Sequence, residues 1–205
     1  FLTHEQTRPK YEGKASFEIT EVTFQTSLGT YLDAPFPRFP DRRDISALTL
    51  EGWDRVMRIN LTSNVLLLRE AHPLLKLAPN GGRVAIVGSK NVAAPGPGAS
   101  MYSASKAALT QLMRVAALEW GEDHIRINTV HPDAVFDTAL WTEEILQKRA
   151  QSYGMTVEQY KTKNILKTEI TSHHVGEMVA EMCGPLFSRT TGAQIPLDGG
   201  NDRVI

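Results

Sequence analysis

The sequence has one cysteine, Cys183, among its 205 residues. A single thiol cannot form an internal disulfide and cannot supply the several thiolates of a structural zinc site. Long apolar runs are also missing: the longest, Val65 to Leu68, is far shorter than the ~20 residues that a membrane-spanning helix needs. We therefore expect no secreted disulfide framework and no membrane protein, and a reducing, cytoplasmic setting.

Neither sign of charge is in excess. Lys and Arg total 22 against 23 Asp and Glu, which gives a formal net charge of -1. No block of like charge accompanies this balance, so the sequence offers no electrostatic footprint for nucleic acid or for an anionic membrane surface. The apolar share of 41% is that of an ordinary globular domain.

From Thr49 onward, patterns typical of buried strands and of amphipathic helices alternate. This alternation predicts an α/β fold with a parallel sheet and right-handed crossovers. The expected strands are 83–88, 125–131 and 193–197, and the expected helices are 50–77 with a kink at Pro73, 102–120, 140–150, 157–166 with a capping box of Thr156 and Gln159, and 171–183.

Residues 1–48 have a different character, rich in Thr, Pro and aromatic side chains. Apolar residues alternate within 16–25, which predicts a short β segment with a bulge or turn. Three prolines between Pro35 and Pro40 then break regular structure. We therefore expect two parts, a β-containing extension over 1–48 and an α/β part over 49–205.

Tyr102 and Lys106 stand four residues apart on a predicted helix, so their side chains share one face. An ammonium beside a phenol favours the phenolate, which lowers a pKa that starts near ~10 and makes the phenol a usable acid or base. Ser89 follows a predicted buried strand and could hydrogen-bond the same substrate oxygen. Taken alone, Tyr-x-x-x-Lys recurs by chance and is more often an ordinary helical pair.

The surroundings of this pair resemble a known enzyme family. Tyr102-Ser-Ala-Ser-Lys106 with Ser89 upstream resembles the catalytic pattern of the short-chain dehydrogenases/reductases. Three further stretches are similar to that family in the same order: Met57–Thr62 with its Asn60, Ile125–Pro132 and Thr191–Gly200. The likeness covers about three-quarters of the chain.

The resemblance implies a role for each matching residue. Tyr102 would be the general acid/base on the substrate oxygen, and Ser89 would orient and polarise that oxygen. Lys106 would lower the pKa of Tyr102 and hold the nicotinamide ribose. Asn60 would fix a water that links Lys106 to solvent. The implied reaction is hydride transfer between a nicotinamide cofactor and a small alcohol, aldehyde or sugar-derived carbonyl compound.

The implied cofactor is NAD or NADP, held by Tyr102, Lys106, Pro132 and Val135. A dinucleotide fold also needs a glycine-rich first turn for the pyrophosphate, and neither Gly-x-Gly-x-x-Gly nor Gly-x-x-x-Gly-x-Gly opens this sequence. We therefore predict a partial Rossmann-like, doubly wound parallel sheet that lacks its first nucleotide-binding half. We also expect little or no NAD(P)-dependent turnover by this chain alone.

Two narrower resemblances concern parts of the chain. The segments Gly88–Gly98, Asn128–Val135 and Trp141–Leu166 resemble the dehydrogenase half of bifunctional rhamnulose-phosphate aldolase/alcohol dehydrogenases. Phe24–Phe39 resembles a motif of the cyclase-like metal-dependent hydrolases, but Ser27, Tyr31 and Pro37 stand where that family has histidines. Only Asp33 is left as a ligand, so we expect no metal site and no chemistry in this segment.

Other side chains carry weaker signals. None of the six histidines has ligand spacing, which favours surface, capping or packing roles. Trp141 and Tyr153 lie where related enzymes have a substrate loop, and lining a pocket and packing in a core are equally open for them. Related enzymes pair their long helices across a two-fold axis, so we expect a homo-oligomer acting on a small-molecule substrate.

Three functional hypotheses follow. The first is an oxidoreductase of the short-chain type. The second is a truncated or fused, catalytically silent chain without cofactor binding, which the missing glycine-rich turn favours for the isolated chain. The third is a fragment of a cyclase-like hydrolase, which its missing histidines disfavour.

Overall fold

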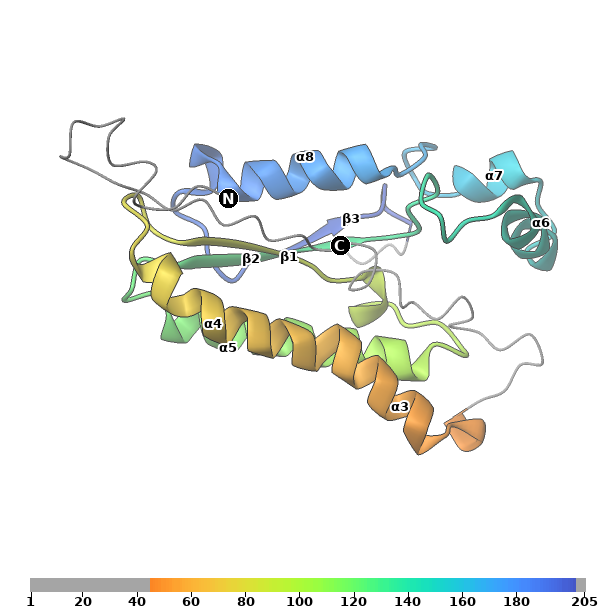
Figure 1. The fold of residues 1–205 in the computed structure, drawn as a ribbon. Helices are drawn as coiled ribbons and strands as arrows, with labels where there is room; N and C mark the ends of the chain where they lie inside the picture. The colour runs from red at the N-terminus through yellow and green to blue at the C-terminus, as the bar shows by residue number, and fades with distance from the viewer. Residues whose placement is uncertain (1–44, 202–205) are drawn as a thin grey trace, which may run out of the picture.

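The computed structural model describes residues 45–201, which form three layers of secondary structure (Figure 1). A parallel sheet lies in the middle. Helices α4 (Ser63–Lys76) and α5 (Ser100–Glu119) run along one of its faces, and α8 (Ser172–Cys183) runs along the other. Helices on both faces make this the doubly wound α/β arrangement that the alternating pattern predicts.

The sheet confirms the three predicted strands as parallel neighbours. They are β1 (Arg83–Val87), β2 (Arg126–Pro132) and β3 (Gln194–Leu197), in the order β1-β2-β3. The pairs Val87–Val130 and Pro132–Leu197 place the carboxyl ends of all three strands at one edge. The loops that follow the three strands therefore all begin at that edge of the sheet.

The remaining helical segments connect these layers. They are η2 (Ile45–Ala47), α3 (Leu50–Met57), the π-helical η3 (Arg58–Thr62), η4 (Lys90–Val92), α6 (Glu143–Ser152), α7 (Val157–Lys161) and η5 (Pro185–Phe187).

Helix α5 supplies much of the main core. Leu109 and Met113, at most 2% exposed, pack with Ile125 and Ile127 at the start of β2. Fully burying a side chain of this size contributes about 1.5–3 kcal/mol. The core thereby fixes α5 against the sheet, and with it the first turns of the helix, where the predicted site residues lie.

The predicted helix over 50–77 is interrupted. The π-helical segment η3 separates α3 from α4, and Pro73 lies inside α4 without ending it. Two side chains take up backbone carbonyls at this point: the Ser63 hydroxyl donates to Ile59 and the Asn64 amide donates to Asn60. Such bonds compete with the regular helix ladder, and π-turns are frequent at functional sites.

Two other boundaries differ from expectation. The predicted helices 140–150 and 157–166 exist as α6 and a shorter α7. The capping box at the start of α7 is confirmed, because Thr156 and Gln159 exchange hydrogen bonds of 2.9 and 3.2 Å. Helix α7 ends early, and the Asn164 side chain bonds both the amide and the carbonyl of a loop residue that follows.

Several predictions on the first part of the chain lie outside the described residues. These are the β segment over 16–25, the cyclase-like motif with Asp33, and almost all of the extension over 1–48. The boundary between residues 48 and 49 and the missing first half of the sheet therefore stay predictions. In the part that the structure describes, no helix combines the length and apolarity needed to cross a membrane.

Candidate active site

A cavity of about 230 Å³ lies where β1 and β2 end, beside the first turns of α5. Open α/β sheets bind their ligands at this carboxyl edge. The predicted catalytic and cofactor-binding residues that line the cavity are Ser89, Tyr102, Lys106, Pro132 and Val135. The structure thus brings together all of the predicted site residues except Asn60.

Ser89 reaches the cavity because β1 ends just before it. The residue is 7% exposed, and its hydroxyl accepts a hydrogen bond of 3.2 Å from the Asn91 amide at the start of η4. The serine is therefore fixed both by the strand that precedes it and by the helical turn that follows.

Tyr102 and Lys106 project from successive turns of α5, as their spacing predicts. Lys106 is buried at 5% exposure, and its ammonium donates a hydrogen bond of 3.2 Å to the carbonyl of Val87. The same ammonium lies 5.7 Å from the centre of the Tyr102 ring. A positive charge is thus held next to the phenol by the end of β1.

Asn60 lies under α5 and does not line the cavity. Its amide donates a hydrogen bond of 3.0 Å to the Ser105 hydroxyl, which in turn donates to the carbonyl of Tyr102 at 2.7 Å. Both Asn60 and Ser105 are at most 2% exposed. The π-helical segment therefore contacts α5 through Ser105, a residue to which the sequence analysis assigned no role.

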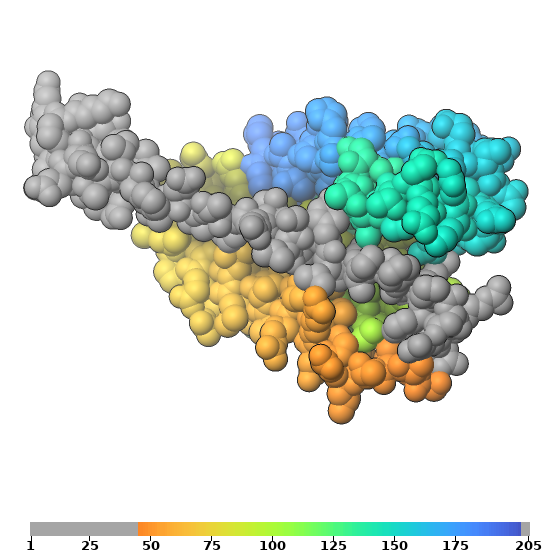
Figure 2. Space-filling model, turned by 45° about the vertical axis from the view of Figure 1, so that its right-hand side comes forward, coloured from red at the N-terminus to blue at the C-terminus, as the bar shows by residue number. Residues whose placement is uncertain are grey.

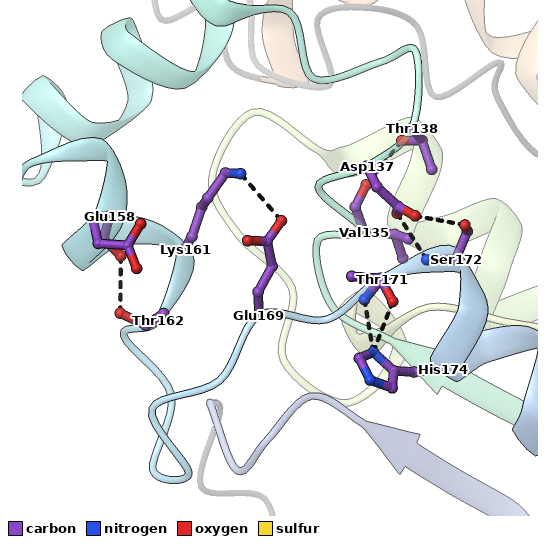
Figure 3. A network of polar contacts seen from close by, with 10 residues as sticks. All are labelled: Val135, Asp137, Thr138, Glu158, Lys161, Thr162, Glu169, Thr171, Ser172 and His174. Carbon is purple, nitrogen blue, oxygen red and sulfur yellow. Dashed lines mark hydrogen bonds and ion pairs between the residues drawn. The ribbon is translucent and has the colours of Figure 1, made fainter.

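Pro132 at the end of β2 and Val135 in the loop that follows both line the cavity, and this loop is anchored on two sides. The Asp133 carboxylate forms an ion pair of 2.8 Å with Lys90, which follows Ser89. Further along, the Asp137 carboxylate accepts hydrogen bonds of 2.7 and 2.6 Å from the amide and hydroxyl of Ser172, at the start of α8 (Figure 3). These bonds, the hydroxyl bond first, lower the pKa of Asp137.

His131 contacts the backbone of Ser89 from behind the residues that line the cavity, and the sequence analysis did not single it out. Its Nδ1 lies 2.9 Å from the carbonyl oxygen of Ser89, and its Nε2 lies 2.7 Å from Oε1 of Gln194. A Cβ atom at Gly88 would come within 2.6 Å of the ring, so the imidazole lies directly against a glycine backbone. The available signal was its place at the carboxyl end of the strand next to Ser89.

The far wall of the cavity comes from α6, α7 and the segments around them. Trp141 and Tyr153 both line the cavity, and Trp141 also packs on Phe136 with ring centres 4.9 Å apart. Tyr160 is 5% exposed, and burial raises the pKa of its phenol. In Figure 2 the teal and blue surface of α6 and α8 lies across the molecule from the orange surface of α3.

This wall also carries three polar side chains that the sequence analysis did not assign to the site, Arg149, Tyr160 and Lys163, each of which lines the cavity and comes from α6, α7 or the segment after α7. These residues lie within the segment Trp141–Leu166, but no spacing in the sequence shows which of its side chains point toward Ser89. Among residues 45–201 no three His, Cys, Asp or Glu side chains come close enough to hold a metal ion.

Comparison with known proteins identifies relatives over most of this chain. A family model described as enoyl-(acyl carrier protein) reductase, of the short-chain alcohol dehydrogenase type, matches residues 36–202. The uncharacterized oxidoreductase YuxG of Bacillus subtilis is 36% identical over 157 residues, which are 74% of this chain and 23% of that protein. The uncharacterized NAD-dependent oxidoreductase Rv0687 of Mycobacterium tuberculosis is 33% identical over 75% of this chain and 56% of its own length. The chain therefore spans about half or less of these relatives.

Solved structures agree with these matches. A short-chain dehydrogenase family protein from Francisella tularensis is 26% identical, with a TM-score of 0.65 over 77% of this chain and 64% of that one. Sorbitol-6-phosphate 2-dehydrogenase from Erwinia amylovora has a TM-score of 0.69 over 78% of this chain and 63% of that one. At 22% identity, this likeness shows the fold alone. The narrower likeness to the bifunctional aldolase/dehydrogenases stays a prediction.

Proposed function

The chain belongs to the short-chain dehydrogenase/reductase family, and from this premise we propose that it catalyses hydride transfer between NAD or NADP and a small alcohol, aldehyde or sugar-derived carbonyl compound. The observation that carries the proposal is the convergence of Ser89, Tyr102 and Lys106 on one cavity at the carboxyl edge of the sheet. An acid/base group, a hydrogen-bonding hydroxyl and a fixed cation are what proton transfer at a substrate oxygen requires.

Each of these residues has a proposed role. The Tyr102 hydroxyl gives a proton to the substrate oxygen during reduction and takes it back during oxidation. The Ser89 hydroxyl donates to the same oxygen and fixes its direction. Lys106, held by the Val87 carbonyl, favours the phenolate form of Tyr102 through its charge.

Asn60 is proposed to hold the relay water that links Lys106 to solvent. Its amide contacts Ser105, the neighbour of Lys106 in α5, and this supports a role beside the lysine. The π-helical turn that carries Asn60 places a buried polar side chain under the catalytic helix. We also propose that Asn60 helps to position Tyr102, because Ser105, which accepts a hydrogen bond from Asn60, donates one to the carbonyl of Tyr102.

The cavity fits the nicotinamide end of the cofactor. Lys106 and Tyr102 line it from α5, where the ammonium can hold ribose hydroxyls, and Pro132 and Val135 line it from the end of β2 and the loop that follows. When bound, the cofactor gives or accepts the hydride. No glycine-rich turn for the pyrophosphate occurs in the sequence, so we expect weak binding by this chain and slow turnover.

The test is a single-turnover assay of the full chain, with enzyme in excess over a lactaldehyde-like aldehyde and with NADH and NADPH in turn. We expect slow oxidation of one of the two cofactors, reduced about 10²- to 10⁴-fold by Tyr102→Phe. Ser103→Ala is the matched control, because it removes a hydroxyl one residue along α5 that has no hydrogen bond in the described part of the chain. Equal rates for Tyr102→Phe and the unaltered chain would contradict the proposal.

We further propose that the chain forms a homo-oligomer in the cytoplasm. Apolar side chains are exposed along the outer face of α4 and α5, among them Leu67 at 51%, Leu74 at 70% and Leu118 at 82%. An apolar stripe of this kind is typical of a surface that another copy covers. Light scattering should show a dimer or larger species, and a stable monomer at low concentration would contradict it.

A further inference from the structure

Two cations face the cavity from the wall opposite Tyr102. Arg149 projects from α6 and Lys163 follows α7, and both side chains are half-buried. Within residues 45–201 neither makes an ion pair or a hydrogen bond through its charged group. Lysines close to them in the sequence do form ion pairs: Lys148 pairs with Glu144 at 2.6 Å, and Lys161 pairs with Glu169 at 3.1 Å.

Ring contacts hold Lys163 in place without satisfying its hydrogen-bond donors. Its ammonium lies 4.8 Å from the ring centre of Tyr153 and 5.2 Å from that of Tyr160. Such cation–π contacts fix the position of the charge. The three donors of the ammonium are thus available to a ligand in the cavity.

Tyr160 adds a neutral donor to the same wall. The residue is 5% exposed and lines the cavity, yet its hydroxyl has no hydrogen-bond partner in the described part of the chain. The hydroxyl is not one of the fully enclosed unpaired side-chain atoms of residues 45–201, so a ligand in the cavity can reach it. Because burial raises the pKa of Tyr160, the phenol stays protonated and able to donate.

The cavity offers little negative charge to neutralise these groups. Asp133 is the acidic residue among those that line it, and its carboxylate already pairs with Lys90 at 2.8 Å and accepts from Asn201. The wall formed by α6 and α7 is therefore a positive surface with donors and aromatic rings. A carboxylate or a phosphate is the partner that such a surface recognises.

We propose that Arg149, Tyr160 and Lys163 form a subsite for an anionic substituent, a phosphate or a carboxylate, at the end of the substrate remote from the reacting carbon. This subsite rests on the proposed function, because the proposed function places the reacting oxygen of the substrate beside Ser89 and Tyr102, on the other wall of the cavity. The phosphates of the cofactor are a poorer fit, since dinucleotide folds hold the pyrophosphate at the first turn of the sheet and not on a segment after β2.

The test measures binding without any cofactor, so that it does not depend on turnover. Two matched pairs of probes are titrated calorimetrically into the full chain: dihydroxyacetone phosphate against dihydroxyacetone, and 3-hydroxybutyrate against butane-1,3-diol. We expect the charged member of at least one pair to bind about tenfold more tightly or better, because hydrogen bonds to charged groups are among the strong ones. The pair that shows the preference identifies phosphate or carboxylate.

Variants assign the preference to the subsite. Arg149→Met and Lys163→Met should each reduce the preference for the charged probe about tenfold, and Tyr160→Phe should reduce it by less. Lys148→Met, one residue along α6 on the exposed side, is the matched control and should leave it unchanged. Arg149→Lys and Lys163→Arg keep the charge and should keep most of the preference, which separates loss of charge from loss of folding.

Tyr102→Phe separates this inference from the proposed reaction. The preference should persist in Tyr102→Phe, and it should persist even if the unaltered chain shows no turnover. Equal affinity for charged and uncharged probes in both pairs would overturn the subsite. So would a preference that survives in both Arg149→Met and Lys163→Met.

Discussion

The two walls of the cavity are built from different kinds of structure. One is formed by the ends of β1 and β2 and the first turns of α5, which belong to the main core around Leu109 and Met113. The other is formed by the loop after β2 and by α6 and α7, which pack around a separate cluster of Phe136, Leu146 and Tyr160. The walls share a cavity without sharing a core.

This difference matches the two tasks that we propose for the walls. Lys106 on the first wall is 5% exposed and held by a strand carbonyl, so its position follows that of the sheet. Arg149 and Lys163 on the second wall are half-buried and make no hydrogen bond within residues 45–201 through their charged groups. Proton transfer needs fixed geometry, whereas substrate recognition can reside on an insertion that packs on its own.

The largest expected effect concerns the main core. Leu109→Ala should lower the free energy of unfolding by about 2–5 kcal/mol, because it leaves a cavity among residues that are nearly fully buried. Urea titration followed by circular dichroism measures this. Leu186→Ala, in η5 and 75% exposed, should change it by less than about 0.5 kcal/mol. Equal losses for the two variants would mean that α5 does not pack on the sheet as described.

Removal of the charge on the first wall should have the next largest effect. Lys106→Met should reduce the single-turnover rate about a hundredfold and move the pH profile of alcohol oxidation toward higher pH, because the phenolate of Tyr102 loses its neighbouring cation. Binding of the charged probes should change little, since their proposed subsite lies on the second wall. A rate loss without a shift of the pH profile would contradict the role given to Lys106.

His131 tests whether the strand ends position Ser89. His131→Leu removes both the contact with the Ser89 carbonyl and the contact with Gln194, and we expect about a tenfold lower rate with a smaller change in KM. His131→Asn keeps a polar group and should recover part of the loss. His173→Asn, at an exposed histidine that pairs with Glu177, is the control and should be neutral. An unchanged rate in His131→Leu would exclude a positioning role.

The smallest effect concerns the anchor of the loop after β2. The pKa of Asp137 is lowered by its bonds from Ser172, so the folded chain binds this proton less tightly than the unfolded chain does. The stabilisation is therefore complete above the unfolded pKa of about 3.9 and is lost as the pH falls through the folded value. Asp137→Asn should lower the melting temperature slightly at pH 7, and the difference should shrink below about pH 4.

The control for that experiment is Asp54→Asn on α3, an exposed carboxylate. It should leave the pH dependence as it is in the unaltered chain. A melting difference for Asp137→Asn that is the same at pH 7 and at pH 3 would show that the carboxylate charge does not matter to the anchor.

Much of the fold follows from local patterns in the sequence. The short apolar run Val84–Val87 marks β1, because strands covered on both faces are mostly apolar, and the helices between the strands make them parallel. Strand β2 is covered as well, but it also buries the polar side chains of Asn128 and Thr129. Tyr102 and Lys106 share a face because four residues complete about one turn. The π-helical turn at Asn60 had no such signal: there the backbone amide of Ser63 bonds five residues back to Arg58, and the side chains of Ser63 and Asn64 bond two further carbonyls.

The sequence by itself determined the α/β class, the three strands, the long helix α5 and five of the residues that line the cavity. Each of these depends on neighbours along the chain or on a motif of fixed spacing. The tertiary structure alone decided that His131 contacts Ser89 across two strands, that Asn60 contacts α5 through Ser105, and that Arg149, Tyr160 and Lys163 face the cavity. These contacts join residues far apart in the chain, and they depend on how α6 and α7 pack around their own aromatic cluster, which no periodicity in the sequence encodes.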